Sequence, residues 1–189
     1  MKKIIHIISL AFIAICFYAN AGAQTAHKAT TLKIFFIRHG EKPDTGNNLS
    51  CEGFNRSIQL PKVLHDKIGI PAYVFVPKLG LGTSTGQSRM FQTVSPFAIK
   101  YNLAVNTTYK ETDSVQVANE LKLLHGNVLV VWEHTSIAPI IRQLGVKAPG
   151  LKWPGTDFDG IWIVTFKNGT PKLSKSKEGI KNLSKHCQF

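Results

Sequence analysis

The chain has 189 residues, of which 43% are hydrophobic and 10% aromatic, and it contains three cysteines. This length suits one domain with a sizeable core, and the composition excludes an intrinsically disordered chain. Three cysteines are too few for a disulfide-rich scaffold. The net charge of +12 raises the question of a polyanionic partner, which the distribution of charge along the chain addresses.

The N-terminus has the pattern of a secretory signal peptide. Two lysines precede an apolar run over residues 4–19, and Ala21-Gly22-Ala23 supplies the small residues of a cleavage site. The apolar run is shorter than the roughly 20 residues of a spanning helix. We therefore predict a signal peptide over residues 1–23, export to the periplasm or outside the cell, and no stable membrane insertion after cleavage.

The rest of the chain divides into a lead over residues 24–30, a domain over 31–166 and a basic tail over 167–189. The tail carries lysines without arginine or interleaved aromatic residues, which favours a solvated surface segment and no nucleic-acid partner. Cys51 and Cys187 remain after cleavage. A disulfide between them and two free thiols are both open at this stage. The oligomeric state is also open.

Apolar runs alternate with helical patterns along the domain. The run 128–132 is the most apolar and is typical of a strand covered on both faces. Asp113 is a candidate N-cap for the predicted helix 114–124. This alternation predicts an α/β fold: a three-layer sandwich with a mostly parallel central sheet flanked by helices. The expected elements are strand 32–37, helix 50–67, strand 72–76, helix 89–101, strand 103–107, helix 114–124, strand 128–132, helix 135–144 and strand 161–166.

Charged residues follow two of the predicted strands. Arg38 and His39 come after the first strand, and His134 comes after strand 128–132. In sheets of this kind ligands bind beyond the carboxyl ends of the strands. Arg89 opens a helix behind a Gly/Ser/Thr loop over 80–87, whose backbone donors suit an anion. Arginine holds phosphate oxygens through two hydrogen bonds. The two arginines and two histidines together therefore predict a phosphate pocket.

Each of these residues also has an ordinary interpretation. A single histidine such as His39 is more often packed than reactive, and a single arginine such as Arg89 is more often a surface cation. Two histidines without a nearby carboxylate are a poor metal site. We therefore expect no metal and no cofactor, and the case for a site depends on the residues occurring together.

The motif Arg38-His39-Gly40 after a buried strand resembles the signature of the histidine phosphatase superfamily, also called phosphoglycerate mutase-like. The resemblance extends over residues 32–166. Three further segments are similar to family motifs and occur in the same order: Leu49-Ser50-x-x-Gly53-x-x-Arg56, Ser88-Arg89-x-x-Gln92-Thr93, and a strand followed by His134.

The resemblance implies a mechanism. His39 would attack phosphorus and form a phosphohistidine that water hydrolyses. Arg38, Arg89 and His134 would hold the phosphoryl oxygens of a small phosphorylated substrate. Arg56 would either contact the phosphate or stabilise the first helix.

The general acid is open. The resemblance favours Glu111, which stands where one branch of the family has a glutamate. Asp113 is a second candidate, although a helix cap would explain it. Glu133 is a third, but a strand residue in that place should point away from His134. A site without a dedicated acid is the remaining option. The family usually has a small residue at position 133 and a shorter segment over 77–87.

Two functions are compatible with these residues. The first is an exported phosphatase that hydrolyses phosphate monoesters through His39. The second is a catalytically weak or inactive phosphate- or polyanion-binding domain of the same fold. A mutase is less expected because the sugar-phosphate substrates of mutases are cytoplasmic.

Overall fold

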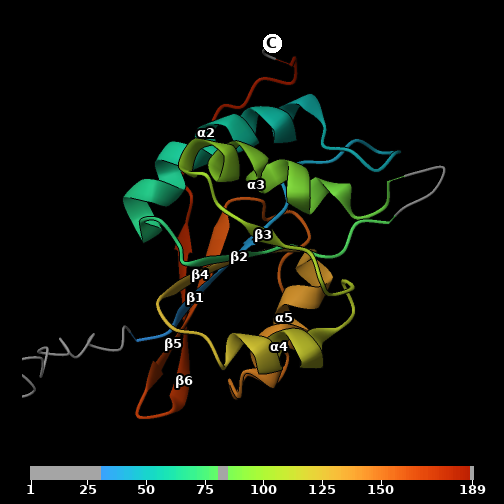
Figure 1. Cartoon of the computed structure of the whole chain (residues 1–189). Helices are drawn as coiled ribbons and strands as arrows, with labels where there is room; N and C mark the ends of the chain where they lie inside the picture. The colour runs from blue at the N-terminus through green and yellow to red at the C-terminus, as the bar shows by residue number, and fades with distance from the viewer. Residues whose placement is uncertain (1–30, 81–84, 188–189) are drawn as a thin grey trace, which may run out of the picture.

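A computed structural model describes residues 31–80 and 85–187 (Figure 1). The predicted signal peptide and the whole predicted lead over 24–30 lie outside the described residues, as do residues 81–84 of the predicted anion-binding loop. The elements are β1 (Lys33–Arg38), α2 (Cys51–Ile68), β2 (Tyr73–Phe75), α3 (Ser88–Tyr101), β3 (Val105–Asn106), α4 (Ser114–Leu121), β4 (Asn127–Trp132), α5 (His134–Gln143), β5 (Gly160–Lys167) and β6 (Thr170–Lys177).

The strands form one mixed sheet with the order β3-β2-β4-β1-β5-β6. The pairs β2–β3, β2–β4 and β1–β4 are parallel, whereas β1–β5 and β5–β6 are antiparallel. Helices α2 and α3 cover one face and α4 and α5 the other (Figure 1). The predicted three-layer α/β sandwich is confirmed.

Strand β1 shows how the sequence builds both layers. Successive side chains of a strand point to opposite faces. Ile34 and Phe36 join the core under α4 and α5, while Phe35 and Ile37 join the core under α2 and α3. All four are buried. This explains why the first predicted strand is apolar at every position rather than alternating.

The predicted boundary at residue 166 is wrong. Residues 170–177 form β6, which pairs along its whole length with β5. Asn168 and Gly169 connect the two strands with φ of 50° and 75°, the left-handed backbone of a tight hairpin turn. Lysines along an exposed edge strand oppose pairing with another chain. The basic segment is therefore an edge of the domain, with its lysines in solvent as expected.

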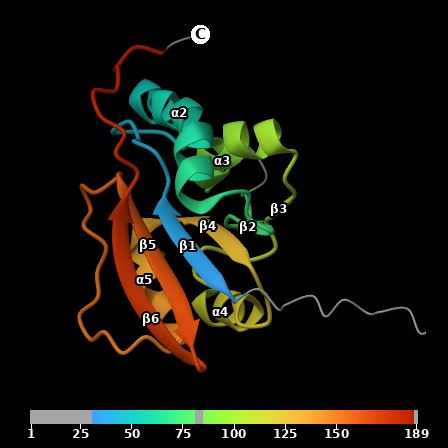
Figure 2. The same ribbon diagram turned by 90° about the vertical axis from the view of Figure 1, so that its left-hand side faces the viewer.

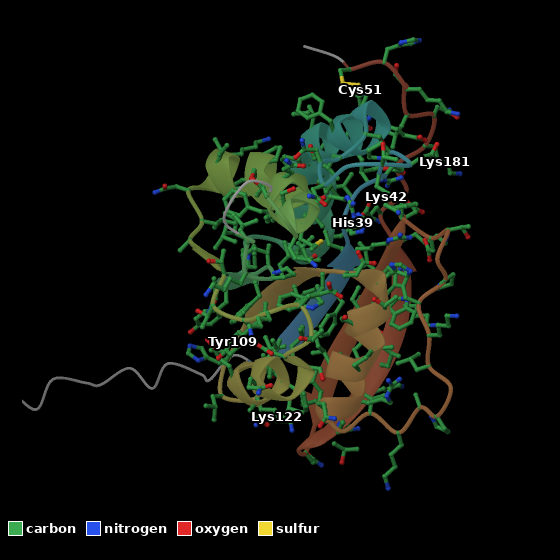
Figure 3. The ribbon with its side chains drawn as sticks, turned by 90° about the vertical axis from the view of Figure 1, so that its right-hand side faces the viewer. His39, Lys42, Cys51, Tyr109, Lys122 and Lys181 are labelled. Atoms are coloured by element: carbon green, nitrogen blue, oxygen red, sulfur yellow. A yellow bond between two sulfur atoms is a disulfide. The ribbon has the colours of Figure 1, made fainter. Side chains whose placement is uncertain are left out.

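The segment after β6 returns to α2 (Figure 2). Nδ2 of Asn55 in α2 donates to the carbonyls of Ser184 and His186 at 2.9 and 2.8 Å. Cys187 forms a disulfide with Cys51 at the start of α2 (Figure 3). Of the two alternatives left open by the sequence, the structure has the paired one. The bond closes a loop of 136 residues, so it links the two ends of the domain.

The proposed helix cap at Asp113 is also wrong. Asp113 directly precedes α4, but its side chain caps no helical N–H. Its Oδ2 instead accepts a hydrogen bond of 2.9 Å from the backbone N–H of Lys110. Asp113 therefore closes the turn before α4, a common role for aspartate.

No helix in the described ranges is long and apolar enough to cross a membrane.

Candidate active site

The two histidines lie at the same edge of the sheet, as predicted. Strands β1 and β4 are parallel neighbours in which Arg38 pairs with Trp132. His39 follows the first strand and Glu133 and His134 follow the second, so the topology places all three together. Figure 3 shows His39 just beyond the end of β1, on the side of α2 and α3.

His39 is fully buried and fixed through one ring nitrogen. Its Nδ1 lies 2.6 Å from the carbonyl oxygen of Gly40. A carbonyl only accepts hydrogen bonds, so Nδ1 carries a proton and donates it. The other nitrogen, Nε2, faces Glu133 at 2.9 Å. The backbone of the Arg38-His39-Gly40 motif therefore leaves Nε2 as the nitrogen available for chemistry.

Glu133 lies between the two histidines, and the prediction that it points away from His134 is wrong. β4 ends at Trp132, so Glu133 is the N-cap of α5 rather than a strand residue. Its Oε1 accepts from the backbone N–H of His134 at 3.0 Å and is also bonded to Nδ1 of that residue. Burial alone would raise the pKa of Glu133, but its contacts with His39 and His134 lower that pKa to about 2.

Arg38 is almost completely buried beneath the loop that precedes β5. Its Nη1 donates to the carbonyl of Gly155 at 2.5 Å, and its Cζ lies 3.8 Å from the centroid of the Phe158 ring. Burial lowers the pKa of Arg38, against the opposing charges of nearby carboxylates. The Phe158 ring also meets His39 edge-on, with centroids 6.0 Å apart. Sequence reasoning missed Gly155 and Phe158, because only the tertiary fold brings this loop to the site.

His134 begins α5 and is the more accessible histidine, with 22% of its side chain exposed. Burial and the charge of Arg38 lower the pKa of His134, although Glu133 opposes the shift. The neutral ring is therefore favoured at neutral pH.

The segment that begins α3 braces the loop before α2. Oγ1 of Thr93 accepts from the backbone N–H of Gly40 at 2.9 Å, and Oε1 of Gln92 accepts from that of Leu49 at 3.0 Å. Nη2 of Arg89 donates to the carbonyl of Gly46 at 2.8 Å. The segment from Ser88 to Thr93 thus holds the loop between β1 and α2 at three points.

Two buried guanidinium nitrogens of the described residues are hydrogen-bond donors without an acceptor. Within the described residues, Nε of Arg38 and Nε of Arg89 have no hydrogen-bond partner. The charge of Arg89 also contributes to lowering the pKa of Arg38, so the two cations lie close enough to repel each other. Buried donors are normally satisfied. An anion between these side chains would satisfy both N–H groups and offset the repulsion.

Gly40 and Gly53 occur in two of the motifs because the backbones touch there. A Cβ on Gly40 would lie 2.9 Å from the carbonyl oxygen of Gly53, and one on Gly53 would overlap the carbonyl of Glu41. The first turn of α2 therefore packs directly on the loop that carries His39.

The structure assigns Arg56 to the support of α2 rather than to the phosphate. Its Nε and Nη2 bind the Glu41 carboxylate at distances from 2.7 to 3.1 Å, and its Nη1 binds Oε2 of Glu178 at 2.7 Å. Arg56 is buried. Of the two roles that the sequence left open, these contacts favour stabilisation: Arg56 belongs to an ion cluster that joins the loop after β1 to the C-terminal segment.

Glu178 makes the stability of this cluster depend on pH. Burial raises the pKa of Glu178 to about 8, against the charge of Arg56 and with the help of Asp159 and Glu41. In the unfolded chain the pKa returns to about 4.5. The folded state thus binds the extra proton between these values, and this stabilisation is lost as the pH rises through 8. We expect the free energy of unfolding of the unmodified protein to fall between pH 5 and 9. The free energy of unfolding of the Glu178→Gln variant should fall less over the same range. Urea denaturation of both proteins at pH 5, 7 and 9 measures the difference, and parallel curves would contradict it.

Glu111 lies beside the site without touching either histidine. Its carboxylate accepts from Nε2 of Gln87 at 2.8 Å and from Oγ of Ser136 at 2.7 Å. It lines a surface cavity of about 510 Å³ together with residues that include Lys78 and Lys110. Glu111 thus connects the starts of α3 and α5.

Among residues 31–80 and 85–187, no group of three or more His, Cys, Asp or Glu side chains is arranged to hold a metal ion. Arg38 and Arg89 supply positive charge to the described site, and the two histidines add hydrogen-bonding ring nitrogens.

Comparisons with known proteins identify the fold. No family model matches the sequence, and a search of curated proteins finds no match. Solved structures do match. The protein histidine phosphatase SixA, complexed with tungstate, superposes with a TM-score of 0.56 at 19% identity, covering 77% of this chain and 97% of that one.

Two further enzymes match to a similar degree. A phosphoserine phosphatase mutant from Entamoeba histolytica, in complex with phosphoserine, has a TM-score of 0.54 at 13% identity and covers 78% of this chain and 96% of its own. The alpha-ribazole phosphatase from Shigella flexneri has a TM-score of 0.53 at 10% identity, with 83% and 98% covered. The chain therefore shares the fold of these phosphatase structures, the α/β fold that the resemblance of its motifs predicted.

Proposed function

We propose that this protein is a phosphatase that hydrolyses phosphate monoesters through a phosphohistidine on His39. The observation that carries the proposal is the hydrogen bond from Nδ1 of His39 to Gly40, which directs Nε2 to the same edge as Arg38 and His134. SixA, the phosphoserine phosphatase and the alpha-ribazole phosphatase share the fold, which supports the same conclusion.

Each residue then has a defined role. Nε2 of His39 attacks phosphorus, and the ester oxygen leaves. Arg38, Arg89 and His134 contact the phosphoryl oxygens and stabilise the charge that spreads over them in the transition state. Water hydrolyses the phosphohistidine and restores His39. The substrate is a small phosphorylated molecule, because the pocket offers a few cationic groups rather than an extended surface.

A chromogenic phosphate ester tests the proposal. We expect the full protein to hydrolyse nitrophenyl phosphate, vanadate to inhibit, and EDTA to leave the rate unchanged, because arginine and histidine supply the positive charge. Steady-state rates with and without each reagent provide the measurement. A rate that EDTA abolishes and a divalent ion restores would assign the reaction to a metal mechanism.

The same assay distinguishes a phosphatase from the alternative function, a binding domain without turnover. His39 is fully buried and Glu133 occupies its reactive nitrogen, which is also compatible with a phosphate- or polyanion-binding domain that does not turn over. Such a domain would bind vanadate or phosphate in calorimetry and release no nitrophenolate.

We further propose that the protein is exported, to the periplasm or outside the cell. The signal-peptide pattern over residues 1–23 supports this, and the Cys51–Cys187 disulfide suits an oxidising compartment. N-terminal sequencing of protein from the native cell should begin at Gln24. A chain that begins at Met1 would contradict the cleavage.

A further inference from the structure

We propose that Glu133 is the catalytic acid and base of this site: it takes the proton from Nε2 of His39 and delivers it to the leaving oxygen of the phosphate ester. The inference rests on the proposed phosphatase function and names a residue for the proton transfers. Position 133 is usually small in proteins with these motifs, so the assignment comes from the geometry of this chain alone.

The contacts of His39 determine where the proton lies in the resting site. Nδ1 donates to the Gly40 carbonyl at 2.6 Å, and Nε2 lies 2.9 Å from Oε2 of Glu133. A carboxylate only accepts, so Nε2 donates to it and the ring carries both protons. An imidazolium has no lone pair on Nε2 and cannot attack phosphorus. The nucleophile is therefore formed only when that proton moves, and Glu133 is the acceptor in contact with it.

The charges around Glu133 change when a phosphate ester enters. In the resting site the carboxylate is held ionised, with a pKa of about 2, by its contacts with both histidines. A phosphoryl dianion beside Arg38 replaces the Glu133 carboxylate as the counterion of that arginine and puts a like charge next to Glu133. Both changes favour the protonated form of Glu133. As phosphorus approaches Nε2, the Glu133 side chain turns aside and carries the proton with it.

The complete cycle balances. Glu133 accepts the proton of Nε2, and the lone pair that this frees forms the N–P bond while the P–O bond to the leaving group breaks. The leaving oxygen takes that electron pair and the proton of Glu133 and departs as an alcohol. The Glu133 carboxylate then accepts a proton from water as the water oxygen bonds to phosphorus and the N–P bond breaks. The proton finally returns to Nε2, and inorganic phosphate leaves.

Glu111 is the competing carboxylate. Its two oxygens are taken up by Gln87 and Ser136, and in the part of the chain that the structure describes it has no hydrogen bond to His39 or His134. Glu133 contacts both and keeps 16% of its side chain exposed, which lets it reach a bound ester. The two assignments therefore predict different behaviour for two otherwise matched variants.

The experiment compares Glu133→Gln, Glu111→Gln and, as a control in the first turn of α2, Glu52→Gln. Single-turnover rates are measured with an alkyl phosphate, whose leaving oxygen needs a proton, and with nitrophenyl phosphate, which leaves unaided. Glu133→Gln removes the carboxylate that keeps the proton on Nε2, so the neutral ring can attack either ester and only the protonation of the leaving oxygen is lost. We therefore expect the alkyl ester to slow by roughly 10²–10⁴-fold and the nitrophenyl ester to change only a few-fold. Glu111→Gln and Glu52→Gln should change the ratio of the two rates little.

A second readout follows from the hydrolysis step. Glu133→Gln has no base for the attacking water, so phosphohistidine should accumulate on His39 with nitrophenyl phosphate, and an alkaline quench preserves it. A glutamine amide oxygen still accepts from the His134 N–H, and Glu133→Asp retains a carboxylate if the glutamine variant unfolds. The aspartate variant should show a smaller loss with the same preference for the nitrophenyl ester.

Three outcomes would overturn the proposal. An equal loss on both esters assigns Glu133 a structural role. A faster reaction on both esters shows that Glu133 only blocks His39. A leaving-group dependence in Glu111→Gln instead assigns the acid to Glu111. If the unmodified protein hydrolyses neither ester and gains no phosphoryl group on His39, the proposed phosphatase function itself fails, which is a distinct result.

Discussion

Replacing His39 with alanine should reduce phosphate-ester hydrolysis to background, a loss on the order of 10⁶-fold, which is the scale seen when a hydrolase loses its nucleophile. No other described side chain has a nitrogen fixed in the same place, because the Gly40 carbonyl orients only this ring. Steady-state rates with nitrophenyl phosphate measure the loss.

His39→Asn provides the structural control for that variant. His39 is fully buried, so alanine leaves a cavity, whereas an asparagine amide can still donate to the Gly40 carbonyl. We expect both variants to be inactive and the asparagine variant to be the more stable in urea denaturation. Activity within ten-fold of the unmodified protein in either variant would refute His39 as the nucleophile.

Replacing Arg56 with leucine should lower the free energy of unfolding by about 3–5 kcal/mol, because it leaves the Glu41 carboxylate without its cation and the buried Glu178 side chain without its hydrogen-bond donor. Arg56 binds Glu41 through two nitrogens and Glu178 through a third, and it is 5% exposed. Arg56→Lys should also destabilise, since a lysine cannot reproduce the paired bonds to Glu41. Urea denaturation at pH 7 measures both variants.

Two measurements check the interpretation of that result. Adding Glu41→Gln to Arg56→Leu should recover part of the lost stability, because the carboxylate that Arg56 binds through two nitrogens is then replaced by a neutral amide. The folded fraction of Arg56→Leu should keep its KM for nitrophenyl phosphate. A small loss of stability together with a large increase in KM would instead assign Arg56 to substrate binding.

The layers and the location of the site could be predicted from the sequence because they depend on local patterns. The apolar runs that became β1 and β4 are buried on both faces, so they contain no polar interruption and are conspicuous. The carboxyl ends of parallel neighbouring strands meet at one edge of the sheet, so the sequence pattern alone predicts that His39 and His134 lie close together. Cys51 and Cys187 could not be paired, because spacing along a chain carries no distance in space.

The features that the sequence did not predict depend on distant contacts or on single positions. β6 has one apolar residue facing the core side, Leu173, so the strand is recognisable only from its pairing with β5. Glu133 was treated as a strand residue, but it follows the last residue of β4 and is the N-cap of α5, which turns its side chain toward the histidines. The partner of Arg56 lies 122 residues away at Glu178. For β6 and Arg56 a distant contact decides the structure, and for Glu133 the position where β4 ends decides it.

Direct identification of the phosphorylated residue tests the central claim. The full protein is mixed with nitrophenyl phosphate, quenched in alkali because phosphohistidine is acid-labile, digested and sequenced by mass spectrometry. We predict a phosphoryl group on His39 that forms during turnover and is absent from His39→Asn. A phosphoryl group on another residue, or turnover without any phosphorylated protein, would contradict the phosphohistidine mechanism.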